Sequence, residues 1–469
     1  MSRLERRLPA ALGLSAAVLY LSFPAAVYPF DAVACAIAVE LGDFKHLVHG
    51  NHLIYGVLAW TWCTVLSALG VGGRAIHLMQ AMDSLLGAAG VAVFCRALLR
   101  LKIGPLVAGA AAAGLAVSRL YWTLSLEAHV YPLGALFVFL AFMEACGEKP
   151  RPERVGFYHA VAILGHVGNA MFLPAAHRLL WTYREGDKKR FLRYFAALSG
   201  VVVVSYAAAA ALWRRPDSFD ELRVWLLGSA ALDVHRKFTW VGGWSMYGFV
   251  EWTINALEMF GSRPTGACLW AVAILGGLAQ LPGRRKLVMA CVLWLAGYAL
   301  LFTNWHPGQI YYRLTDLAPL WVLIALGAEH AAAEFPKWRR VPGLALAVGV
   351  AALGWANLNS AVIPNGNPDR NHDLQRVLWI ARETPENAWV IVDDVDQVYL
   401  PYFAHRRPLN LRYFYDRPAA LKQRVDELKA RGEPVYVVPA ALDPEDTQIF
   451  GDILHLETAR RGTDALIKL

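Results

Sequence analysis

The chain has 469 residues, of which 57% are hydrophobic and only 17% are charged. Soluble domains carry about 25% charged residues. Long apolar runs approach the roughly 20 residues that a bilayer-spanning helix needs, which excludes an ordinary soluble globule. The net charge of +8 lies largely in short loops, so it indicates membrane orientation, and we expect no nucleic-acid partner. The six cysteines form no CxxC pair, so neither a zinc site nor a disulfide framework is predicted.

The first apolar run, 9–27, follows the basic start MSRLERR. No convincing cleavage site precedes Tyr28, so a retained helix with a cytoplasmic N-terminus is favoured over a signal peptide. The next part, 28–75, is then the first outer loop. Within it, 53–69 is apolar and rich in tryptophan but short. We expect a helix lying in the outer interface, although a true span stays open.

The following apolar runs alternate across the membrane in this topology. The run 75–99 ends in a basic cluster, 104–120 returns, 121–129 is expected outside, and 130–146 leads to GEKPRPER. The run 155–183 lies between two basic loops, and its middle, GHVGNAMFLP, predicts two short helices that meet within the membrane. Every strongly basic short loop then falls on one side.

The second half of the apolar part begins with 195–212 and leads to a long outer segment, 213–265. This segment mixes charge with tryptophans and suits interfacial helices plus a mobile loop. Four further helices are expected, at 266–280, 287–302, 314–330 and 342–362. The pattern of apolar runs therefore predicts that residues 1–362 form a mainly α, polytopic transmembrane helical bundle.

The composition changes at 363–469, which is charged and carries three short apolar runs, WVIVDDV, PVYVVPA and IFGDILHL. An amphipathic helix pattern, AALKQRVDELKARG, lies among them. Strands that alternate with helices predict a small α/β domain, and the topology places it outside the membrane.

The first outer loop holds two acids and three histidines. Asp31 follows the first helix and is either a solvated carboxylate or a general base, which needs hydrogen-bond reach and an ionised carboxylate. His46, His49 and His52 recur every three residues beside Asp43, so on a helix they would share one face. Polar packing at the interface is favoured over a divalent metal site, which also stays open.

Three ionisable or polar side chains alternate at the start of a later helix, in SLEAHVYPLGALF. Glu127, His129 and Tyr131 lie at a depth where an ionisable group is a functional hypothesis. A solvated helix-end cap is the alternative. Asp83, in the middle of an apolar run, is expected to face the bundle and to pair with a neighbour. For His166 and Asn169, structural hydrogen bonding is as plausible as a functional role.

The motif NWHPGQIYYRLTD holds His306, Arg313 and Asp316. An outward-facing arginine beside tyrosines suits a lipid phosphate, which its fixed fork of donors matches. Tyrosine with arginine is also typical of an anchor at the membrane edge, and both interpretations stay open.

The stretch YWTLSLEAHVYPLGALF resembles the signature of membrane glycosyltransferases of the GT-C fold. More narrowly, it is similar to the bacterial branch related to protein O-mannosyltransferases, in which a Trp precedes an A-E-V-Y-x-L run. The matching positions are Trp122, Ala128, Val130, Tyr131 and Leu133. His129 stands where the pattern has Glu, and HGNHLIYG matches a His-Pro-Pro-Gly motif only through His49. Asp31 matches the acid that ends the first helix of that branch, although no second acid follows it.

The resemblance implies an inverting transferase in a bacterial cytoplasmic (inner) membrane, using a polyprenyl-phosphate-linked sugar as donor. The acceptor would be a hydroxyl of a protein, lipid or glycan on the outer face, with membrane lipids as further partners. The implied catalytic residues are Asp31, Glu127 and His129. The implied substrate-binding residues are His49, His52, Tyr131, His306 and Arg313.

Two other classes of function stay open. A transporter predicts paired halves with matching broken helices, and no such pairing is visible in the sequence. A non-catalytic binding or assembly protein on the same fold is compatible with the motif differences. Convergence of Asp31 and Glu127 on one outward cavity would favour the transferase.

Overall fold

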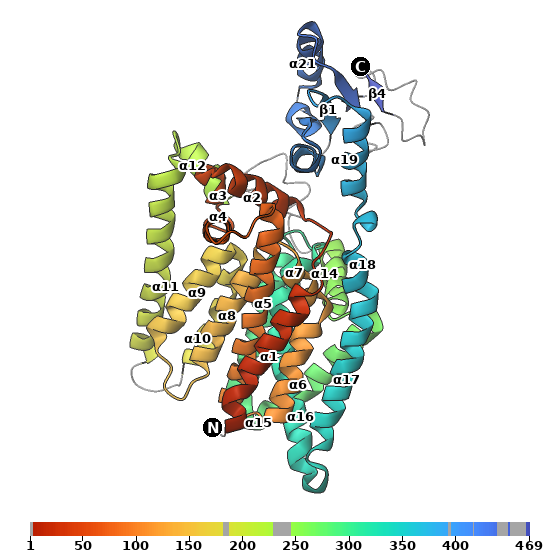
Figure 1. Cartoon of the computed structure of the whole chain (residues 1–469). Coiled ribbons are helices and arrows are strands. Elements are labelled where there is room, and N and C mark those ends of the chain that lie inside the picture. The colour runs from red at the N-terminus through yellow and green to blue at the C-terminus, as the bar shows by residue number, and fades with distance from the viewer. Residues whose placement is uncertain are drawn as a thin grey trace. The chain divides into compact units, whose positions relative to one another are not determined.

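The computed structural model describes residues 3–181, 187–227, 245–392, 395–415, 417–438, 449–450 and 466–469 (Figure 1). Its contacts divide the chain into two compact units. The first unit contains Met1–Ala25 and Ala38–Gly366, and the second contains Ala26–Ile37 and Asn367–Leu469. The division along the chain therefore falls at Gly366, and a short N-terminal segment groups with the C-terminal residues.

Long apolar helices make up most of the first unit. They are α1 (Arg3–Leu21), α5 (Ala75–Arg100), α6 (Pro105–Val117), α8 (Tyr131–Ala145), α9 (Pro152–Gly165), α10 (Leu173–Leu180), α11 (Asp187–Ala209), α15 (Arg263–Phe302), α16 (Leu317–Glu334) and α17 (Val341–Asn357). Among the described residues, five helices are long and apolar enough to cross a membrane. The number is six if the pair α6 and α7 (Arg119–Leu126), bent by 59°, is one span. The predicted polytopic α-helical bundle is confirmed.

The helix α15 is two helices joined at a turn. Arg284 has non-helical backbone angles, and Pro282 lies just before it. A Cβ added at Gly277 would lie 3.8 Å from Val288 Cγ1, although eleven positions separate the two residues. The chain therefore folds back on itself here, as the two predicted helices at 266–280 and 287–302 require.

Glycines bring α15 and α16 into close contact. A Cβ at Gly276 would lie 2.4 Å from the Leu323 carbonyl oxygen, and a Cβ at Gly327 would lie 2.8 Å from the Gly276 Cα. Small residues at such crossings let helix backbones approach, which favours association within a membrane. This crossing fixes the floor of a groove described below.

The predicted hairpin within 155–183 is present as α9, a 3-10 turn over Val167–Phe172, and α10. Asn169 holds the break together. Its Nδ2 donates to the Ala162 carbonyl at 2.9 Å, and its Oδ1 accepts from Tyr298 at 2.8 Å. The Asn169 carbonyl lies 2.8 Å from Nε2 of the buried His159. The polar atoms freed by the broken helix are thus satisfied by protein, as membrane burial demands.

Short helices gather at one end of this bundle. They are α3 (Phe44–Leu47), α4 (Tyr55–Ala68), α7, α12 (Phe219–Leu227) and α14 (Met246–Glu258). With 14 residues, α4 is about 21 Å long, less than the roughly 30 Å hydrocarbon core, so it does not cross as one helix. The predicted interfacial helices within 213–265 are α12 and α14. The mobile loop expected between them lies outside the described residues.

Two details at this end differ from what the sequence suggests. The stretch 121–129 is expected on the outer side, which stays a prediction, and Arg119–Leu126 within it is helical with most of its side chains buried. Its apolar residues find partners in the bundle that sequence periodicity does not show. The three histidines also do not share a helical face, because α3 ends at Leu47 and the chain then turns.

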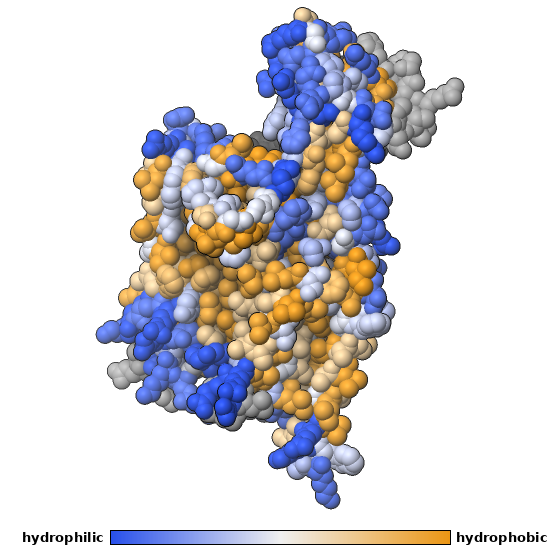
Figure 2. All heavy atoms as spheres, in the orientation of Figure 1, coloured by the Kyte–Doolittle hydropathy of each residue, from blue (hydrophilic) through white to orange (hydrophobic). Residues whose placement is uncertain are grey.

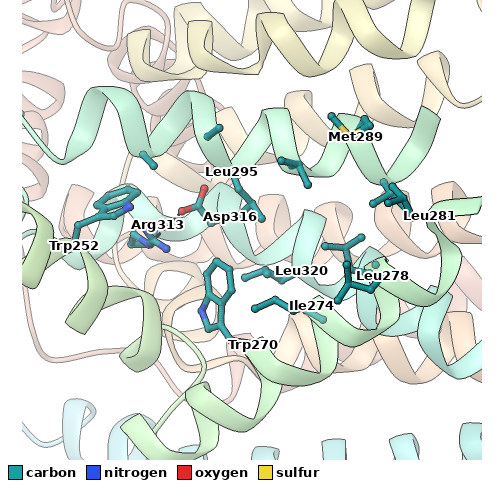
Figure 3. Close-up of a pocket in the computed structure, with 17 residues that line it drawn as sticks. Trp252, Trp270, Ile274, Leu278, Leu281, Met289, Leu295, Arg313, Asp316 and Leu320 are labelled. Atoms are coloured by element: carbon teal, nitrogen blue, oxygen red, sulfur yellow. Dashed lines mark ion pairs between the residues drawn. The ribbon is translucent and has the colours of Figure 1, made fainter. Parts of the chain in front are cut away.

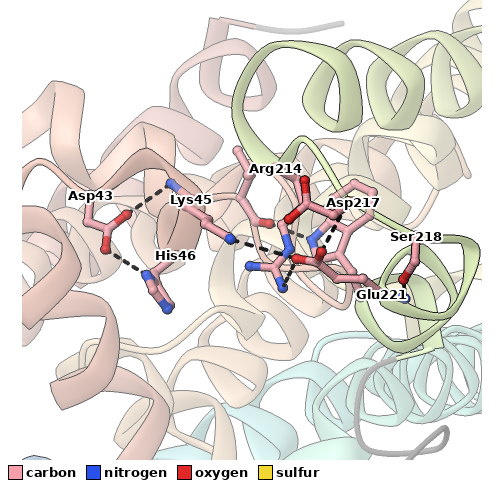
Figure 4. A network of polar contacts seen from close by, with 9 residues as sticks. Asp43, Lys45, His46, Arg214, Asp217, Ser218 and Glu221 are labelled. Carbon is pink, nitrogen blue, oxygen red and sulfur yellow. Dashed lines mark hydrogen bonds and ion pairs between the residues drawn. The ribbon is translucent and has the colours of Figure 1, made fainter.

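A polar network ties the first outer loop to α12 (Figure 4). Glu221 Oε1 lies 3.7 Å from Lys45 Nζ and 3.4 Å from Arg214 Nη2. Asp43 accepts from the Lys45 backbone N–H at 3.1 Å and lies 2.6 Å from His46 Nδ1. Beneath the network, Trp225 is buried and its indole N–H donates to the Val48 carbonyl at 2.8 Å.

The basic loops gather at the opposite end of the bundle. One hollow is lined by residues from the start of α1, the α5–α6 turn and the α8–α9 turn. A second is lined by the α8 end, the α10 end and the α15 turn. Both include Gly147. The two hollows therefore bring together the basic α5–α6, α8–α9 and α15 turns, as the predicted grouping requires of these three. Figure 2 shows apolar surface on the bundle between its hydrophilic ends.

The second unit is a small α/β structure. Its four-stranded sheet has the order β2-β1-β3-β4, with β1 (Trp389–Val392), β2 (Arg407–Asn410) and β3 (Val435–Val437) parallel and β4 (Ile467–Lys468) antiparallel to β3. Its helices include α19 (His372–Glu383) and α21 (Pro418–Ala430). The predicted α/β fold is confirmed. The third predicted strand is wrong where it is described, since Ile449 and Phe450 are helical, and its remainder lies outside the described residues.

Candidate functional site

Asp83 anchors the chain between α7 and α8. It lies in the middle of α5 and is fully buried, as predicted. Its Oδ2 accepts from the Tyr55 hydroxyl and from the His129 backbone N–H, each at 2.7 Å. Because a buried carboxylate requires such donors, Asp83 fixes the position of His129 from a distant part of the sequence.

Imidazole and phenol rings cluster where this turn meets the first outer loop. The ring of His129 lies 4.6 Å from that of Tyr131 and 5.5 Å from that of Tyr311, and Tyr131 lies 4.7 Å from His166. His49 and His52 stack at 4.3 Å in the neighbouring turn. The structure thus brings His129 and Tyr131 together with His166 and Tyr311, two residues that were not predicted to bind substrate.

Burial keeps the imidazoles of this cluster neutral. It lowers the pKa of His129 to about 3, with His52 as a further cause, and lowers the pKa of His52 to about 3, with His166 as a further cause. The Nδ1 atoms of both rings are buried, and no described group hydrogen-bonds to them. Neutral imidazoles can accept a hydrogen bond from a hydroxyl, so the cluster suits an uncharged, hydroxyl-rich ligand.

Glu127 follows α7 with an extended backbone and is 9% exposed. Burial raises the pKa of this carboxyl to about 8. A carboxyl group poised near neutral pH is suited to acid–base or electrostatic work.

Asp31 belongs to the second unit. It lies in the first turn of α2 (Phe30–Leu41) and its side chain is exposed. A carboxylate at a helix start is favoured by the helix dipole. The preceding chain is held within the same unit, because the Tyr399 hydroxyl donates to the Tyr28 carbonyl at 2.5 Å and the Asn371 amide to the Ala26 carbonyl at 2.9 Å.

Arg313 and Asp316 form a buried ion pair beside α16. Arg313 is 2% exposed and Asp316 is 1% exposed, and Arg313 Nε lies 3.2 Å from Asp316 Oδ2. Both lie in the 3-10 turn Ile310–Asp316, in which residues three apart share one side. The guanidinium also lies 3.7 Å from the ring centre of Trp252, a cation–π contact. Arg313 is therefore buried within the bundle, and the spacing of the motif did not indicate this depth.

An apolar groove leads to this ion pair (Figure 3). It has a volume of about 520 Å³ and runs between the two halves of α15 and the first turns of α16. Its walls include Trp270, Ile274, Leu278 and Met289, while Arg313 and Asp316 are its only charged lining residues among those described. Leu278 is 61% exposed, so the groove opens on the surface that α15 presents to the membrane. Its shape suits an apolar chain that ends in an anionic group.

The remaining predicted residues are placed less informatively. His306 lies in a turn with a φ of 45° and packs edge-on to Trp305, with 6.1 Å between the ring centres. Among the described residues, no group of three or more His, Cys, Asp or Glu side chains is arranged to hold a metal ion.

The groove was not predicted from the sequence. Trp252 belongs to the tryptophan-containing segment 213–265, which is expected at the interface, and the sequence indicates no role for Asp316. The signal that could have identified the ion pair is the spacing of Arg313 and Asp316, three apart just before an apolar helix. An uncompensated arginine there would be expensive to bury, and the acid makes burial feasible.

Comparisons with known proteins agree on the fold. No family model and no curated protein sequence matches the chain. The structure is similar to that of apo ArnT from Cupriavidus metallidurans, with a TM-score of 0.64 and 14% identity over 95% of this chain and 94% of that one. The same enzyme bound to undecaprenyl phosphate gives a TM-score of 0.63 at 13% identity, with the same coverage. The apo Archaeoglobus fulgidus oligosaccharyltransferase gives 0.56 at 10% identity, over 97% of this chain and 72% of that one. The chain therefore has the GT-C fold expected from its sequence.

Proposed function

We propose that this protein is an integral membrane glycosyltransferase that moves a sugar from a polyprenyl-phosphate-linked donor to an acceptor hydroxyl. The observation that carries the proposal is the apolar groove that ends at buried Arg313. A long isoprenoid tail needs an apolar track open to the bilayer, and its phosphate needs a cation at the end of that track. The similarity to an enzyme whose structure holds undecaprenyl phosphate supports the same ligand class.

Arg313 retains donors for a phosphate. Its Nε lies 3.2 Å from Asp316 Oδ2, and no described residue hydrogen-bonds to the buried Nε or Nη1. Arginine has five N–H donors, so one carboxylate does not exhaust them. A phosphate oxygen at Nη1 would form a charge-assisted hydrogen bond in a site with little water, while Trp252 holds the guanidinium plane.

The transfer would be a single displacement at the anomeric carbon. An acceptor oxygen forms the new C–O bond as the bond from that carbon to the phosphate oxygen breaks, and the bonding electron pair leaves with the polyprenyl phosphate. Asp31, as general base, takes the hydroxyl proton. Arg313 holds the charge that develops on the leaving phosphate. A carboxylate at Glu127 would stabilise the positive charge that develops on the sugar ring.

The ring cluster is the proposed sugar-binding surface. His52 and His129 supply neutral acceptors for sugar hydroxyls, and Tyr131 supplies an aromatic face. His49 and His306 remain proposed substrate contacts, and the catalytic role of His129 is likewise a proposal. The acceptor is a protein, lipid or glycan. A divalent metal would need ligands from the substrates or from residues outside the described part of the chain.

The proposed orientation follows the charge pattern. The N-terminus and the basic loops lie in the cytoplasm of a bacterial inner membrane, and the chemistry takes place on the outer face. The second unit then lies outside, on the side from which a hydrophilic acceptor arrives.

Binding of the carrier lipid tests the proposal directly. We expect Arg313→Gln to weaken binding of undecaprenyl phosphate to the purified protein by at least tenfold, measured by thermophoresis in detergent. Arg313→Lys keeps the charge but not the fork of donors, so it should lie between the two. The matched control is Arg263→Gln, because Arg263 is exposed on the surface at the start of α15 and pairs with Glu258 at 2.7 Å.

Unchanged affinity in Arg313→Gln would remove Arg313 from phosphate recognition. Equal losses in Arg263→Gln and Arg313→Gln would show a general charge effect. If undecaprenyl phosphate binds and no sugar transfer from any polyprenyl-phosphate sugar is detectable, the non-catalytic binding protein becomes the better description.

A further inference from the structure

A second hollow, at the opposite end of the α15 hairpin, is rich in positive charge. It has a volume of about 550 Å³ and is lined by the α10 end, the α8 end and the α15 turn. Four of its described lining residues are basic and none is acidic: Arg178, Arg284, Arg285 and Lys286.

The groups that face this hollow leave a surplus of positive charge. Lys286 interacts electrostatically with Arg178, Arg190 and Asp187, and also lies near the Cys146 thiol. Asp187 is the one acid of this set, and it lies 3.8 Å from Arg190. Four cations and, among the described residues, no acid line the hollow itself, which leaves a surplus of positive charge around it.

In a nearby hollow at the same end of the bundle, acids partly compensate the positive charge. Five basic and three acidic side chains line it: Arg100, Lys102, Lys149, Arg151, Arg154, Glu5, Glu144 and Glu148. Arg100 lies 3.7 Å from Glu144, and Lys102 lies 3.8 Å from Glu148. Loop charges that serve only to orient the protein can pair with acids in this way. The hollow at the α15 turn has no such acids in its described lining, although its cations are crowded.

We propose that the hollow at the α15 turn binds the phosphate headgroup of an anionic phospholipid. Basic hollows between membrane helices on the cytoplasmic side recognise such headgroups. Arg284 is held in place, since its Nη1 donates to the Leu101 carbonyl at 2.7 Å. Arg285 and Lys286 follow it in the turn and face the same hollow.

The surroundings favour a lipid over a free anion. Apolar side chains of Leu101, Leu179 and Leu287 line the same hollow. Leu281 and Val288, at the inner end of the apolar groove, directly adjoin Pro282 and Leu287 of the hollow in sequence. Acyl chains can therefore lie along α15 while the phosphate rests among the cations. The site is distinct from the one at Arg313. Arg313 lies just before the start of α16, whereas the hollow lies near the other end of this helix, where Glu329 accepts from the Gly104 N–H at 2.8 Å.

Native mass spectrometry of the full-length protein in detergent tests the proposal with phosphatidylglycerol and phosphatidylcholine as probes. We expect phosphatidylglycerol to bind at least tenfold more tightly, and the preference to fall below threefold in the double variant Arg285→Gln/Lys286→Gln. The matched control is Lys102→Gln/Lys149→Gln, which removes the same charge from the nearby hollow that contains three acids and should keep the preference. Arg285→Gln alone affects an exposed side chain, so it should fold and lose part of the preference.

Equal binding of the two lipids to the unmodified protein would overturn the proposal, and so would equal losses in the control variant. Inorganic phosphate provides the remaining arm. If phosphate at millimolar concentration displaces phosphatidylglycerol fully, the hollow is a site for free anions and the lipid assignment is wrong. None of these measurements involves sugar transfer, so the outcome for the lipid site does not depend on the proposed enzymatic function.

Discussion

Single buried ionisable residues fix the positions of particular segments in this bundle. Asp83 and Asp316 are almost fully buried, and each is held by a particular partner: Asp83 by Tyr55 and the His129 backbone, and Asp316 by Arg313. Removing one member of a buried pair leaves the other uncompensated, which costs far more than the pair contributes. A substitution at such a pair, Arg313→Gln included, therefore needs a measurement of thermal stability beside the binding assay, whereas a partly accessible group can be changed with less effect on the fold.

Asp31 is such a group, because its side chain is exposed at the start of α2. We expect Asp31→Asn to reduce sugar transfer by about 10²–10⁴-fold, the usual contribution of a general base. Expression and undecaprenyl phosphate binding should be unchanged. Asp43→Asn, a carboxylate of the same outer loop that pairs with His46, is the matched control and should retain transfer. Full transfer activity in Asp31→Asn would exclude it as the base.

Glu127 predicts a pH dependence. Burial raises the pKa of its carboxyl to about 8, so it holds its proton near pH 7 and loses it as the pH rises. If its carboxylate opposes charge on the sugar, the transfer rate should rise about tenfold between pH 7 and 9, following the ionised fraction. Glu127→Gln should abolish this rise. A rate that falls through pH 8 in the unmodified protein would instead assign Glu127 as a proton donor.

At the scale of helices, hydrophobic runs and basic loops predicted most of the bundle correctly. The hairpin at 155–183 and the two halves of α15 were both visible, because glycine and proline interrupt apolar runs between basic loops. The helix Arg119–Leu126 was not visible in the sequence. Its eight residues include serine, threonine and arginine, lack a clear periodic apolar stripe, and are stabilised by tertiary burial. The depth of Arg313 was missed for a similar reason: burial depends on Asp316 and Trp252, and sequence spacing does not report depth.

The crossing of α15 and α16 should tolerate only the smallest side chains. A Cβ at Gly276 would lie 2.4 Å from the Leu323 carbonyl oxygen, which is backbone and cannot rotate away. We expect Gly276→Leu to separate the helices, to lower stability by about 1–3 kcal/mol, and to weaken undecaprenyl phosphate binding because the groove loses its floor. Thermal unfolding in detergent and the binding assay measure the two effects.

Gly283→Leu is the control for this substitution, since no heavy atom lies within 4 Å of a Cβ added there. It should leave both quantities near those of the unmodified protein. Equal unfolding temperatures for Gly276→Leu and Gly283→Leu would contradict the close approach of the two helices.

For the whole molecule, the sequence predicted some members of the ring cluster, but neither its full membership nor its arrangement. The cluster joins His129 and Tyr131 from the α7–α8 turn with Tyr311 from the turn before α16, and His52 from the first outer loop interacts electrostatically with His129. Sequence placed His52, His129 and Tyr131 on one side of a membrane through the charge rule. It could not show that Asp83, in the middle of a distant helix, holds the turn in place.

This burial of neutral imidazoles links global stability to pH. Burial lowers the pKa values of His52 and His129 to about 3 in the folded protein, whereas in the unfolded chain each returns towards 6.5. The unfolded state then binds more protons below pH 6.5, so the free energy of unfolding falls as the pH drops from about 6.5 towards 3. Each histidine contributes a slope of up to about 1.4 kcal/mol per pH unit.

We expect the unfolding temperature in detergent to fall more steeply between pH 6.5 and 5 in the unmodified protein than in His52→Gln/His129→Gln. The exposed His372, replaced by Gln, is the control and should keep the steep fall. An unfolding temperature independent of pH across this range would show that the two rings are protonated or solvated in the folded protein, and the proposed neutral sugar-binding surface would lose its basis.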